Sequence, residues 1–273
     1  MNKPPPYIDL SEKLGAAWLR PLLPLVGKLS GVSAANRLRV DLGPHHESAD
    51  AFAEAALRAL RVSWRLDGLD PAAGRETGRG TLVLANHPTG IIEALIVMRV
   101  LDLISPGNWK ILANSWVAAK PEFSAHVIPL DPFAWETKAK LNLRGMRGAV
   151  GILKHGGVVG AFPSGRVAAR TDAAGRAIDE PWSGHLVRIA RASGARILLV
   201  HIPLSPGLLL RATPLRFPML RSLLLPREAM RRRRHGTLRV TLAPAPDRLP
   251  ENPARAADLL HQSCHESPGT TPD

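Results

Sequence analysis

The 273-residue chain is poor in cysteine, in aromatic side chains and in long apolar runs. Its one cysteine, Cys264, excludes an intramolecular disulfide and argues against a cysteine-based zinc site, which fits a reducing cytoplasm. No segment reaches the roughly 20 uncharged apolar residues that a membrane-spanning helix needs. The N-terminus, Met1 to Pro6, has no apolar core before a cleavage site and so lacks the pattern of a secretory signal. We therefore expect a cytoplasmic protein.

Positive charge is what the chain has in excess, with 36 basic against 23 acidic residues and a formal net charge of +13. Between residues 201 and 240, nine arginines accompany one acid, Glu228, which gives 9 − 1 = +8. Such charge would suit a nucleic acid. However, aromatic residues make up only 4% of the chain, tyrosine occurs once, and no RNA- or DNA-binding signature is present. We therefore expect no nucleic-acid partner.

An anionic membrane surface is the other partner that this charge suits. The stretch Leu208–His235 interleaves apolar residues with arginines, a pattern typical of segments that dock at a lipid interface. The alternative is a core helix followed by a solvated basic loop. We expect the first, with the protein bound peripherally to the inner face of the cytoplasmic membrane.

Short apolar runs alternate with helical patterns along most of the chain. The runs that predict buried strands cover residues 81–85, 109–113, 126–130, 158–162, 196–202 and 238–242. The helical patterns cover residues 51–66, 91–103, 137–154 and 182–192. This alternation is typical of βαβ units, so we predict an α/β fold in which helices flank a mostly parallel central sheet. Residues 1–49 are predicted to form a partly helical arm, residues 50–265 the main domain, and residues 266–273 a disordered tail.

The segment Asn86-His87-Pro88-Thr89-Gly90-Ile91-Ile92-Glu93 follows the first of these strands. A histidine at the carboxyl end of a strand, with a carboxylate shortly after it, is a candidate general base with its orienting partner. The alternative is that His87 caps a helix and Glu93 is a solvated acid in the first helical turn, where the helix dipole favours it.

A second polar turn, Phe162-Pro163-Ser164-Gly165-Arg166, follows the strand at 158–162. Its main-chain N–H groups and Arg166 could bind an anionic group, and the alternative is a surface turn with a solvated arginine. A nucleophilic Ser164 is a weaker hypothesis because the G-x-S-x-G elbow is absent. Since ligands on parallel sheets bind beyond the carboxyl ends of the strands, we expect this turn and His87 to form one site.

Together these two segments resemble motifs of the glycerophospholipid acyltransferase family, which contains the lysophosphatidic acid acyltransferases. That family has an N-H-x4-D block and an F-P-E-G-T-R block. Here the acid is Glu93, one place later than the pattern requires, Ser164 replaces the glutamate, and Arg166 comes one place early. These departures resemble the branch of ornithine-lipid and hemolysin-like acyltransferases, with its N-H-P-x-G-x-x-D/E block and shortened F-P-x-G turn.

Five further blocks extend the resemblance, in order, from about Ala51 to Pro246. They are Lys110–Asn114, Ile128–Phe133, Asp179–Trp182, Val200–Ile202 and Leu223–Glu228. The resemblance implies an acyltransferase-like fold for residues 50–265.

The resemblance also implies an enzyme that moves a fatty acyl chain from a thioester, acyl carrier protein or coenzyme A, to the hydroxyl of a lyso-lipid. The acceptor would be a lyso-ornithine lipid or a 1-acylglycerol-3-phosphate. His87 would be the general base and Glu93 would hold its ring, with neither metal nor cofactor required. The substrate-binding residues implied are Asn86, Gly90, Lys110, Phe162, Pro163, Ser164, Gly165 and Arg166. Backbone N–H groups near Gly90 or Gly165 are candidate oxyanion donors. A catalytically silent lipid-binding relative is the alternative, against which the intact His87 and Glu93 argue.

Overall fold

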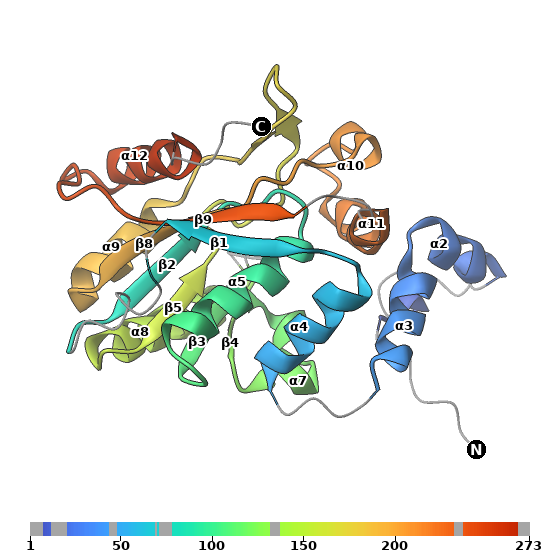
Figure 1. Ribbon diagram of the computed structural model, residues 1–273, viewed down its shortest axis with the longest axis horizontal. Coiled ribbons are helices and arrows are strands. Elements are labelled where there is room, and N and C mark those ends of the chain that lie inside the picture. The colour runs from blue at the N-terminus through green and yellow to red at the C-terminus, as the bar shows by residue number, and fades with distance from the viewer. Residues whose placement is uncertain are drawn as a thin grey trace.

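A computed structural model of the chain describes residues 8–11, 21–43, 48–68, 70, 78–131, 137–231 and 237–266. Its centre is a seven-stranded sheet in the order β1-β9-β8-β2-β5-β3-β4 (Figure 1). The strands are β1 (Trp64–Gly68), β2 (Thr81–Ala85), β3 (Trp109–Asn114), β4 (Val127–Leu130), β5 (Val158–Ala161), β8 (Arg196–His201) and β9 (Leu238–Pro244). A separate two-stranded ribbon consists of β6 (Arg170–Thr171) and β7 (Ala177–Ile178).

The sheet is mostly parallel, as predicted. The five strands from β8 to β4 run in the same direction, whereas β9 is antiparallel to β8 and β1 is parallel to β9. The β2 strand at the centre is buried at all five positions because helices cover both faces of the sheet. Its side chains alternate between two cores, with Val83 and Ala85 in one and Leu82 and Leu84 in the other.

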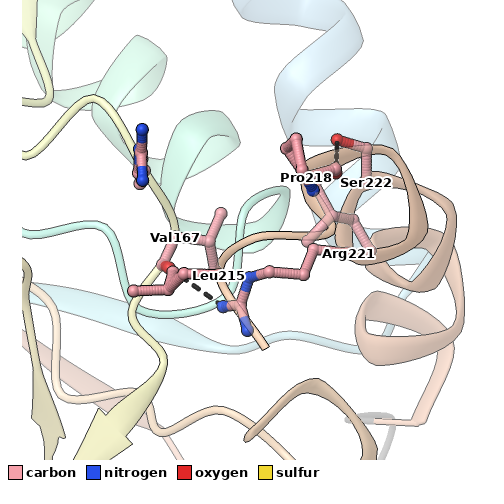
Figure 2. A pocket seen from close by; sticks show the side chains of 7 residues that line it. Val167, Leu215, Pro218, Arg221 and Ser222 are labelled. Atoms are coloured by element: carbon pink, nitrogen blue, oxygen red, sulfur yellow. Dashed lines mark hydrogen bonds between the residues drawn. The ribbon is translucent and has the colours of Figure 1, made fainter. Parts of the chain in front are cut away.

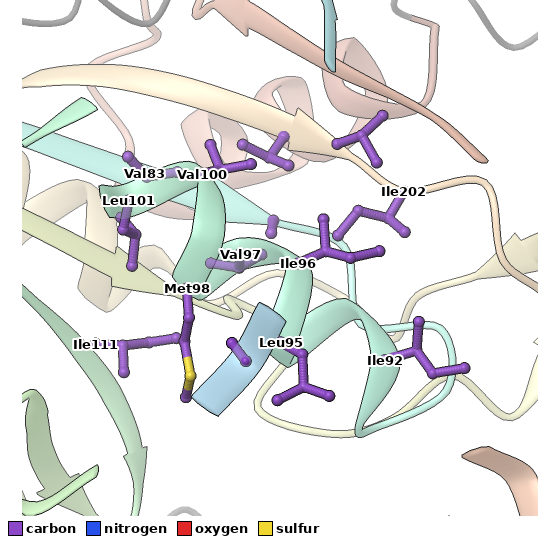
Figure 3. Packing of buried hydrophobic residues seen from close by; sticks show 14 of the residues in the cluster. Val83, Ile92, Leu95, Ile96, Val97, Met98, Val100, Leu101, Ile111 and Ile202 are labelled. Carbon is purple, nitrogen blue, oxygen red and sulfur yellow. The ribbon is translucent and has the colours of Figure 1, made fainter. Parts of the chain in front are cut away.

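On one face lie α4 (Ala49–Ala59) and α5 (Ile92–Ile104). Nine of the 13 residues of α5 are buried, including Ile92, Ile96 and Leu101, which pack among strand side chains such as Val83 and Ile111 (Figure 3). On the other face lie α8 (Ala139–Lys154), α9 (Gly184–Ser193) and α12 (Pro253–Glu266). The molecule is therefore a three-layer α/β structure, with its sheet fixed from both sides.

Four helices gather at one end of the molecule (Figure 1). They are α2 (Leu23–Leu29), α3 (Val32–Asp41), α10 (Leu208–Ala212) and α11 (Pro218–Arg231). A small apolar cluster joins the N-terminal segment to α11 through Ile8, Leu10, Val32 and Leu223. Two short helices, α6 (Ser115–Ala118) and α7 (Pro121–Ser124), connect β3 to β4. No helix in the described ranges is both long enough and apolar enough to cross a lipid bilayer.

Two sequence predictions need correction. The helix predicted over residues 51–66 ends at Ala59, and the chain turns at Arg61, whose φ is +55°, before entering β1. The apolar residues that follow the helix therefore belong to an edge strand paired with β9. In addition, no helix was predicted over residues 253–266, where the structure has α12. Asn252 caps this helix by accepting hydrogen bonds from the N–H groups of Ala254 and Arg255. Residues 12–20, 232–236 and 267–273, which carry parts of the predicted arm, basic segment and tail, lie outside the described residues.

Candidate active site

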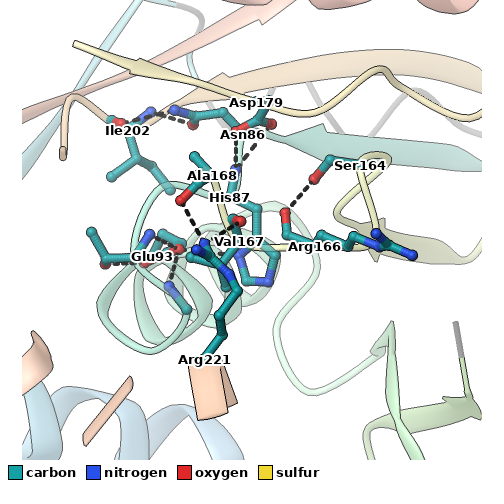
Figure 4. Close-up of polar contacts among 12 residues, drawn as sticks. Asn86, His87, Glu93, Ser164, Arg166, Val167, Ala168, Asp179, Ile202 and Arg221 are labelled. Atoms are coloured by element: carbon teal, nitrogen blue, oxygen red, sulfur yellow. Dashed lines mark hydrogen bonds and ion pairs between the residues drawn. The ribbon is translucent and has the colours of Figure 1, made fainter. Parts of the chain in front are cut away.

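The two polar turns meet at the carboxyl edge of the sheet. Leu84 on β2 is in register with Ala161 on β5, so the residues that follow each strand emerge side by side. The rings of His87 and Phe162 stack with centroids 4.2 Å apart and planes 18° apart. In addition, Ala168 donates its backbone N–H to the carbonyl of His87 at 2.8 Å. The prediction that the two turns lie together is confirmed (Figure 4).

Glu93 is a fully buried partner of His87. Its Oε1 lies 3.1 Å from His87 Nδ1, and the Glu93 side chain is 0% exposed, against 17% for His87. The alternative in which Glu93 is solvated and His87 caps a helix is therefore wrong, because α5 begins at Ile92 with Ile91 in the cap position. Since Nδ1 faces the carboxylate, Nε2 is the ring nitrogen left to take a proton from a substrate.

The carboxylate of Glu93 gathers donors from the turn that precedes it. Thr89 donates both its backbone N–H and its hydroxyl at 2.5 Å, and Gly90 donates its backbone N–H. Burial acts to raise the pKa of Glu93, but the hydrogen bond and charge of His87, together with the bonds from Gly90 and Thr89, outweigh it and lower this pKa below its usual value. Glu93 is therefore an anion held beside the imidazole at neutral pH.

The turn reaches this geometry although the acid comes one place later than in the family pattern. Gly90 has a φ of +99°, a conformation that residues with a Cβ rarely adopt. The reversal at Gly90 lets the first turn of α5 bring Glu93 back over Thr89 and His87. The extra residue is thus accommodated in the loop, and the contact between histidine and carboxylate is kept.

Asp179 is a site residue to which the sequence analysis assigned no role. Both of its carboxylate oxygens accept the backbone N–H of His87, at 3.0 and 3.1 Å, and Trp182 Nε1 donates to one of them at 3.0 Å. Burial raises the pKa of Asp179 to about 6, against the opposing effect of these hydrogen bonds and of the His87 charge. In the sequence, the Asp179–Trp182 block stands out only as part of the resemblance to the acyltransferase family. The signal that points to Asp179 is an acid followed by a tryptophan three places later.

The structure gives Asn86 a different task from substrate binding. Its side-chain amide donates to the carbonyl of Ile202 at 3.0 Å and accepts the N–H of Ile202 at 2.8 Å. Both polar atoms are thus used in tying the end of β2 to the end of β8, and the residue is only 1% exposed. Asn86 therefore stabilises the carboxyl edge of the sheet next to His87.

Lys110 is not brought to the site. Lys110 is in register with Val159 on β5, and Val159 is in register with Leu82 on β2. Leu82 comes five positions before His87. At about 3.3 Å per residue this places Lys110 roughly 16 Å from the level of His87 along the strands. Its ammonium group binds the carbonyl of Ala125. The expectation that Lys110 contacts the acceptor is therefore wrong, because Lys110 is the second residue of β3 and lies near the amino ends of the parallel strands, opposite to the edge that carries His87.

The second turn contributes an aromatic ring that packs on His87 and one exposed cation, Arg166. Phe162 stacks on His87, and the buried Pro163 accepts the N–H of Ser183 through its carbonyl at 3.0 Å. The hydroxyl of Ser164 donates to the carbonyl of Arg166 at 2.9 Å, a bond within the turn that gives no support to a nucleophilic role. Arg166 is exposed and lines a small pocket with Val167, Leu215, Pro218, Arg221, Ser222 and Leu225 (Figure 2).

Backbone N–H groups near Gly90 or Gly165 were expected to face an oxyanion, and those of the two glycines themselves are already used within the protein. Gly90 donates to Glu93, and Gly165, whose φ is +61°, donates to the carbonyl of Phe162 at 3.0 Å. Both glycines therefore shape their turns rather than present free donors. In the described part of the chain, no group of three or more His, Cys, Asp and Glu side chains is arranged to hold a metal ion.

Comparisons with known proteins agree with the fold. No protein-family model matches the chain, and no curated protein matches it. Among solved structures, it is similar to the crystal structure of the 1-acyl-sn-glycerophosphate (LPA) acyltransferase PlsC from Thermotoga maritima. The two share 14% sequence identity with a TM-score of 0.50, over 96% of each chain. The protein therefore has the α/β fold seen in that acyltransferase.

Proposed function

We propose that the protein is an O-acyltransferase that moves a fatty acyl chain from a thioester to the hydroxyl of a lyso-lipid. The observation that carries this proposal is the His87–Glu93 pair, held at the carboxyl edge of a sheet whose fold resembles an LPA acyltransferase. A partly exposed imidazole oriented by a buried anion is suited to remove a proton from a hydroxyl. The thioester donor is acyl carrier protein or coenzyme A, and the reaction requires no further cofactor.

The steps follow from the contacts of the imidazole. His87 Nε2 takes the proton of the acceptor hydroxyl while its oxygen attacks the thioester carbonyl. Glu93 at Nδ1 stabilises the imidazolium that forms, and proton transfer of this kind contributes ~10²–10⁴-fold to the rate. When the tetrahedral intermediate collapses, the carbon–sulfur bond breaks and the imidazolium returns its proton to the departing thiolate. The products are an ester and a free thiol.

Arg166 is the proposed contact for the anionic part of the acceptor. It is exposed at the end of the turn that stacks on His87, and a guanidinium pairs with either a phosphate or a carboxylate. A lyso-ornithine lipid would present a carboxylate and a 1-acylglycerol-3-phosphate a phosphate. Because Ser164 stands where the family motif has glutamate, we propose the lyso-ornithine lipid, as in the branch that the sequence resembles.

We further propose that the protein reaches its lipid acceptor by docking α2, α10 and α11 on the cytoplasmic face of an anionic membrane. These helices and their flanking residues expose large apolar side chains, which are 46–66% exposed. The residues concerned are Leu22, Leu25, Leu29, Leu208, Leu209, Phe217, Met219 and Leu220, and we call this set the apolar end. The exposed Lys28 and Arg216 lie among them and would meet anionic headgroups, at about 1 kcal/mol for each charge near the surface.

Purified protein tests the proposal when it is mixed with acyl carrier protein thioester or acyl-coenzyme A and with each lyso-lipid. Mass spectrometry should detect the diacylated product with wild type and not with His87→Ala. Equal product from both variants would contradict the mechanism. Absence of product with every donor and acceptor, together with retained liposome binding, would favour a silent lipid-binding relative. Salt-sensitive retention on DNA without liposome binding would favour a nucleic-acid-binding protein.

A further inference from the structure

Arg221 is an arginine in the interior of the protein. It lies on α11, is only 6% exposed, and directs its guanidinium at four carbonyl oxygens. Nη1 donates to Leu210 and Thr213, both at 2.7 Å, and Nη2 donates to Val167 at 3.0 Å and Ala168 at 2.9 Å. Burial disfavours its charge and lowers the pKa of Arg221, while Glu180 acts in the opposite direction. A buried cation needs such compensation by hydrogen bonds to persist.

The donor count decides between two roles for this side chain. Arg221 lines the same pocket as Arg166, so it could in principle bind an anionic substrate. A guanidinium has five N–H donors, and the four on Nη1 and Nη2 are matched by the four carbonyls. Only the Nε N–H remains, which is insufficient for a bidentate contact with a phosphate or carboxylate. Arg221 is therefore equipped to hold backbone in place.

The backbone that it holds adjoins the candidate base. Val167 and Ala168 follow the F-P-S-G-R turn, and Ala168 donates its N–H to the carbonyl of His87 at 2.8 Å. Figure 4 shows Arg221 below this segment, with the His87 ring beside it. The guanidinium is thus two hydrogen bonds away from the main chain of His87.

The same helix touches the first turn as well. Leu225 is four residues after Arg221, so both side chains lie on one face of α11. A Cβ at Gly90 would come within 2.8 Å of the Leu225 methyl groups, which means that Leu225 packs directly on the glycine. The two residues of one helical face therefore contact the two loops that make up the site.

The remaining bonds of Arg221 join α10 to this arrangement. Leu210 lies within α10 and Thr213 directly follows it, and Glu228 on α11 accepts the N–H of Gly207, the residue before α10, at 3.1 Å. Hydrogen bonds thus join α10 to α11 at both of its ends, and we call the two helices the α10–α11 unit. Its residues Arg221 and Leu225 contact the two turns of the site.

We propose that Arg221 is a positioning residue for acyl transfer: it fixes the Val167–Ala168 main chain, and through it the main chain of His87, against the α10–α11 unit. This assignment rests on the proposed function, because it takes His87 as the base. Misplacement of a base by about 1 Å can cost 10²-fold in rate without changing substrate binding. The effect of losing Arg221 should therefore appear in kcat and not in KM.

Kinetics of Arg221→Met, Arg221→Lys and Arg221→Ala test the proposal. The matched control is Arg144→Met, which removes an exposed arginine of α8, away from both turns and from the apolar end. We expect kcat to fall about 10- to 100-fold in Arg221→Met with both KM values nearly unchanged. Arg221→Lys should recover part of the rate, added guanidinium should do so in Arg221→Ala, and Arg144→Met should match wild type.

Amide hydrogen exchange gives a readout that does not depend on activity. Exchange in residues 163–169 should become faster in Arg221→Met and stay as in wild type in Arg144→Met. If wild type transfers no acyl group, the proposed function fails while this exchange result still tests the loop contact. Wild-type kcat with wild-type exchange in Arg221→Met would overturn the proposal, as would a rise in KM alone. If Arg221→Met does not fold, Arg221→Lys decides by the same two criteria.

Discussion

At the scale of single residues, the environment of Glu93 determines what His87 can do. The carboxylate is fully buried and accepts bonds from His87, Thr89 and Gly90. An anion in such a position holds the imidazole in one tautomer and stabilises it when it takes up a proton. Its charge is therefore as important as its shape.

We predict that Glu93→Gln, which keeps the size and removes the charge, lowers kcat by about 10²-fold or more. The amide has one acceptor oxygen for the donors that now meet two, and its NH₂ group faces other donors. Steady-state kinetics with the best donor and acceptor would measure the loss. Glu54→Gln, which changes a partly exposed acid on α4 that pairs with Arg58 and Arg99, is the matched control and should retain wild-type kcat. A Glu93→Gln rate within twofold of wild type would contradict the role given to the carboxylate.

The sequence allowed His87, Glu93 and the F-P-S-G-R turn to be predicted because each follows a strand, and the carboxyl ends of parallel strands share one edge. It did not reveal the roles of Asp179 and Arg221. Their partners are backbone atoms, the N–H of His87 and four carbonyl oxygens, and backbone atoms leave no signature in a residue pattern. The prediction for Lys110 was wrong although its place could be read from the sequence. It is the second residue of the strand predicted over residues 109–113, so it lies near the amino ends of the parallel strands.

At the scale of elements, strongly periodic segments were predicted well. The strand at 81–85 has its predicted bounds, and α5 is shifted by one residue. The failures lie where local and tertiary preferences differ. Continuing the α4 pattern would have made a longer helix, yet pairing with β9 recruits Trp64–Gly68 into the sheet. Pairing partners distant in sequence cannot be seen in a window of a few residues.

Asn86 joins two elements, and its loss should reduce stability more than its position in a loop would indicate. Asn86→Ala leaves the N–H and the carbonyl of Ile202 without their buried partner. We predict that the free energy of unfolding falls by about 2 kcal/mol, the usual cost of an unsatisfied buried polar group. Urea denaturation would measure it. Asn108→Ala, in an exposed turn, should leave the midpoint unchanged, and an equal shift in both variants would argue against the Asn86 contact.

The apolar end should be required for binding to anionic lipid. Met219→Glu combined with Leu220→Glu places two charges on residues that are 56% and 49% exposed, so folding should be spared. We predict that at least tenfold less of the double variant sediments with vesicles of phosphatidylglycerol and phosphatidylcholine. The reason is that carboxylates do not enter the headgroup boundary and are repelled by anionic lipid. The control is Leu143→Glu on α8, a leucine that is 48% exposed at another place. Equal loss in the control, or none in the double variant, would refute the assigned surface.

At the scale of the whole molecule, three histidines between α12 and β8 make the fold sensitive to acid. His261 and His265 on α12 have ring centroids 4.9 Å apart, and His265 lies 5.4 Å from His201. Burial lowers the pKa of His201 to about 4 and that of His265 to about 4, with the neighbouring histidine and Arg176 acting in the same direction. Burial lowers the pKa of His261 as well, against the effect of Asp258.

His201 and His265 are neutral in the fold above about pH 4, whereas in the unfolded chain they take up protons below about pH 6.5. Their contribution to stability is therefore complete above pH 6.5 and is lost as the pH falls towards 4. Asp179 acts in the opposite direction, since its raised pKa makes the fold less stable as the pH rises from about 4 to about 6. At roughly 1.4 kcal/mol for each pKa unit, the effects of His201 and Asp179 are opposite and similar in size, and His265 adds to the effect of His201.

We therefore predict that the free energy of unfolding is about 1–3 kcal/mol lower at pH 4.7 than at pH 7.5. Urea denaturation at the two values measures it. His265→Phe should reduce the difference, and His155→Phe, which changes an exposed histidine, should not. Stability that is equal at both pH values in wild type would contradict the account of the cluster.

The chemistry proposed for the whole protein depends on one nitrogen, Nε2 of His87. The most direct test is the single-turnover rate of acyl transfer from acyl carrier protein thioester to lyso-ornithine lipid, measured for wild type and His87→Ala with both substrates bound. General-base catalysis predicts that the variant binds both substrates and reacts about 10²–10⁴-fold more slowly. A His87→Ala rate equal to that of wild type would contradict the assignment of His87 as the base.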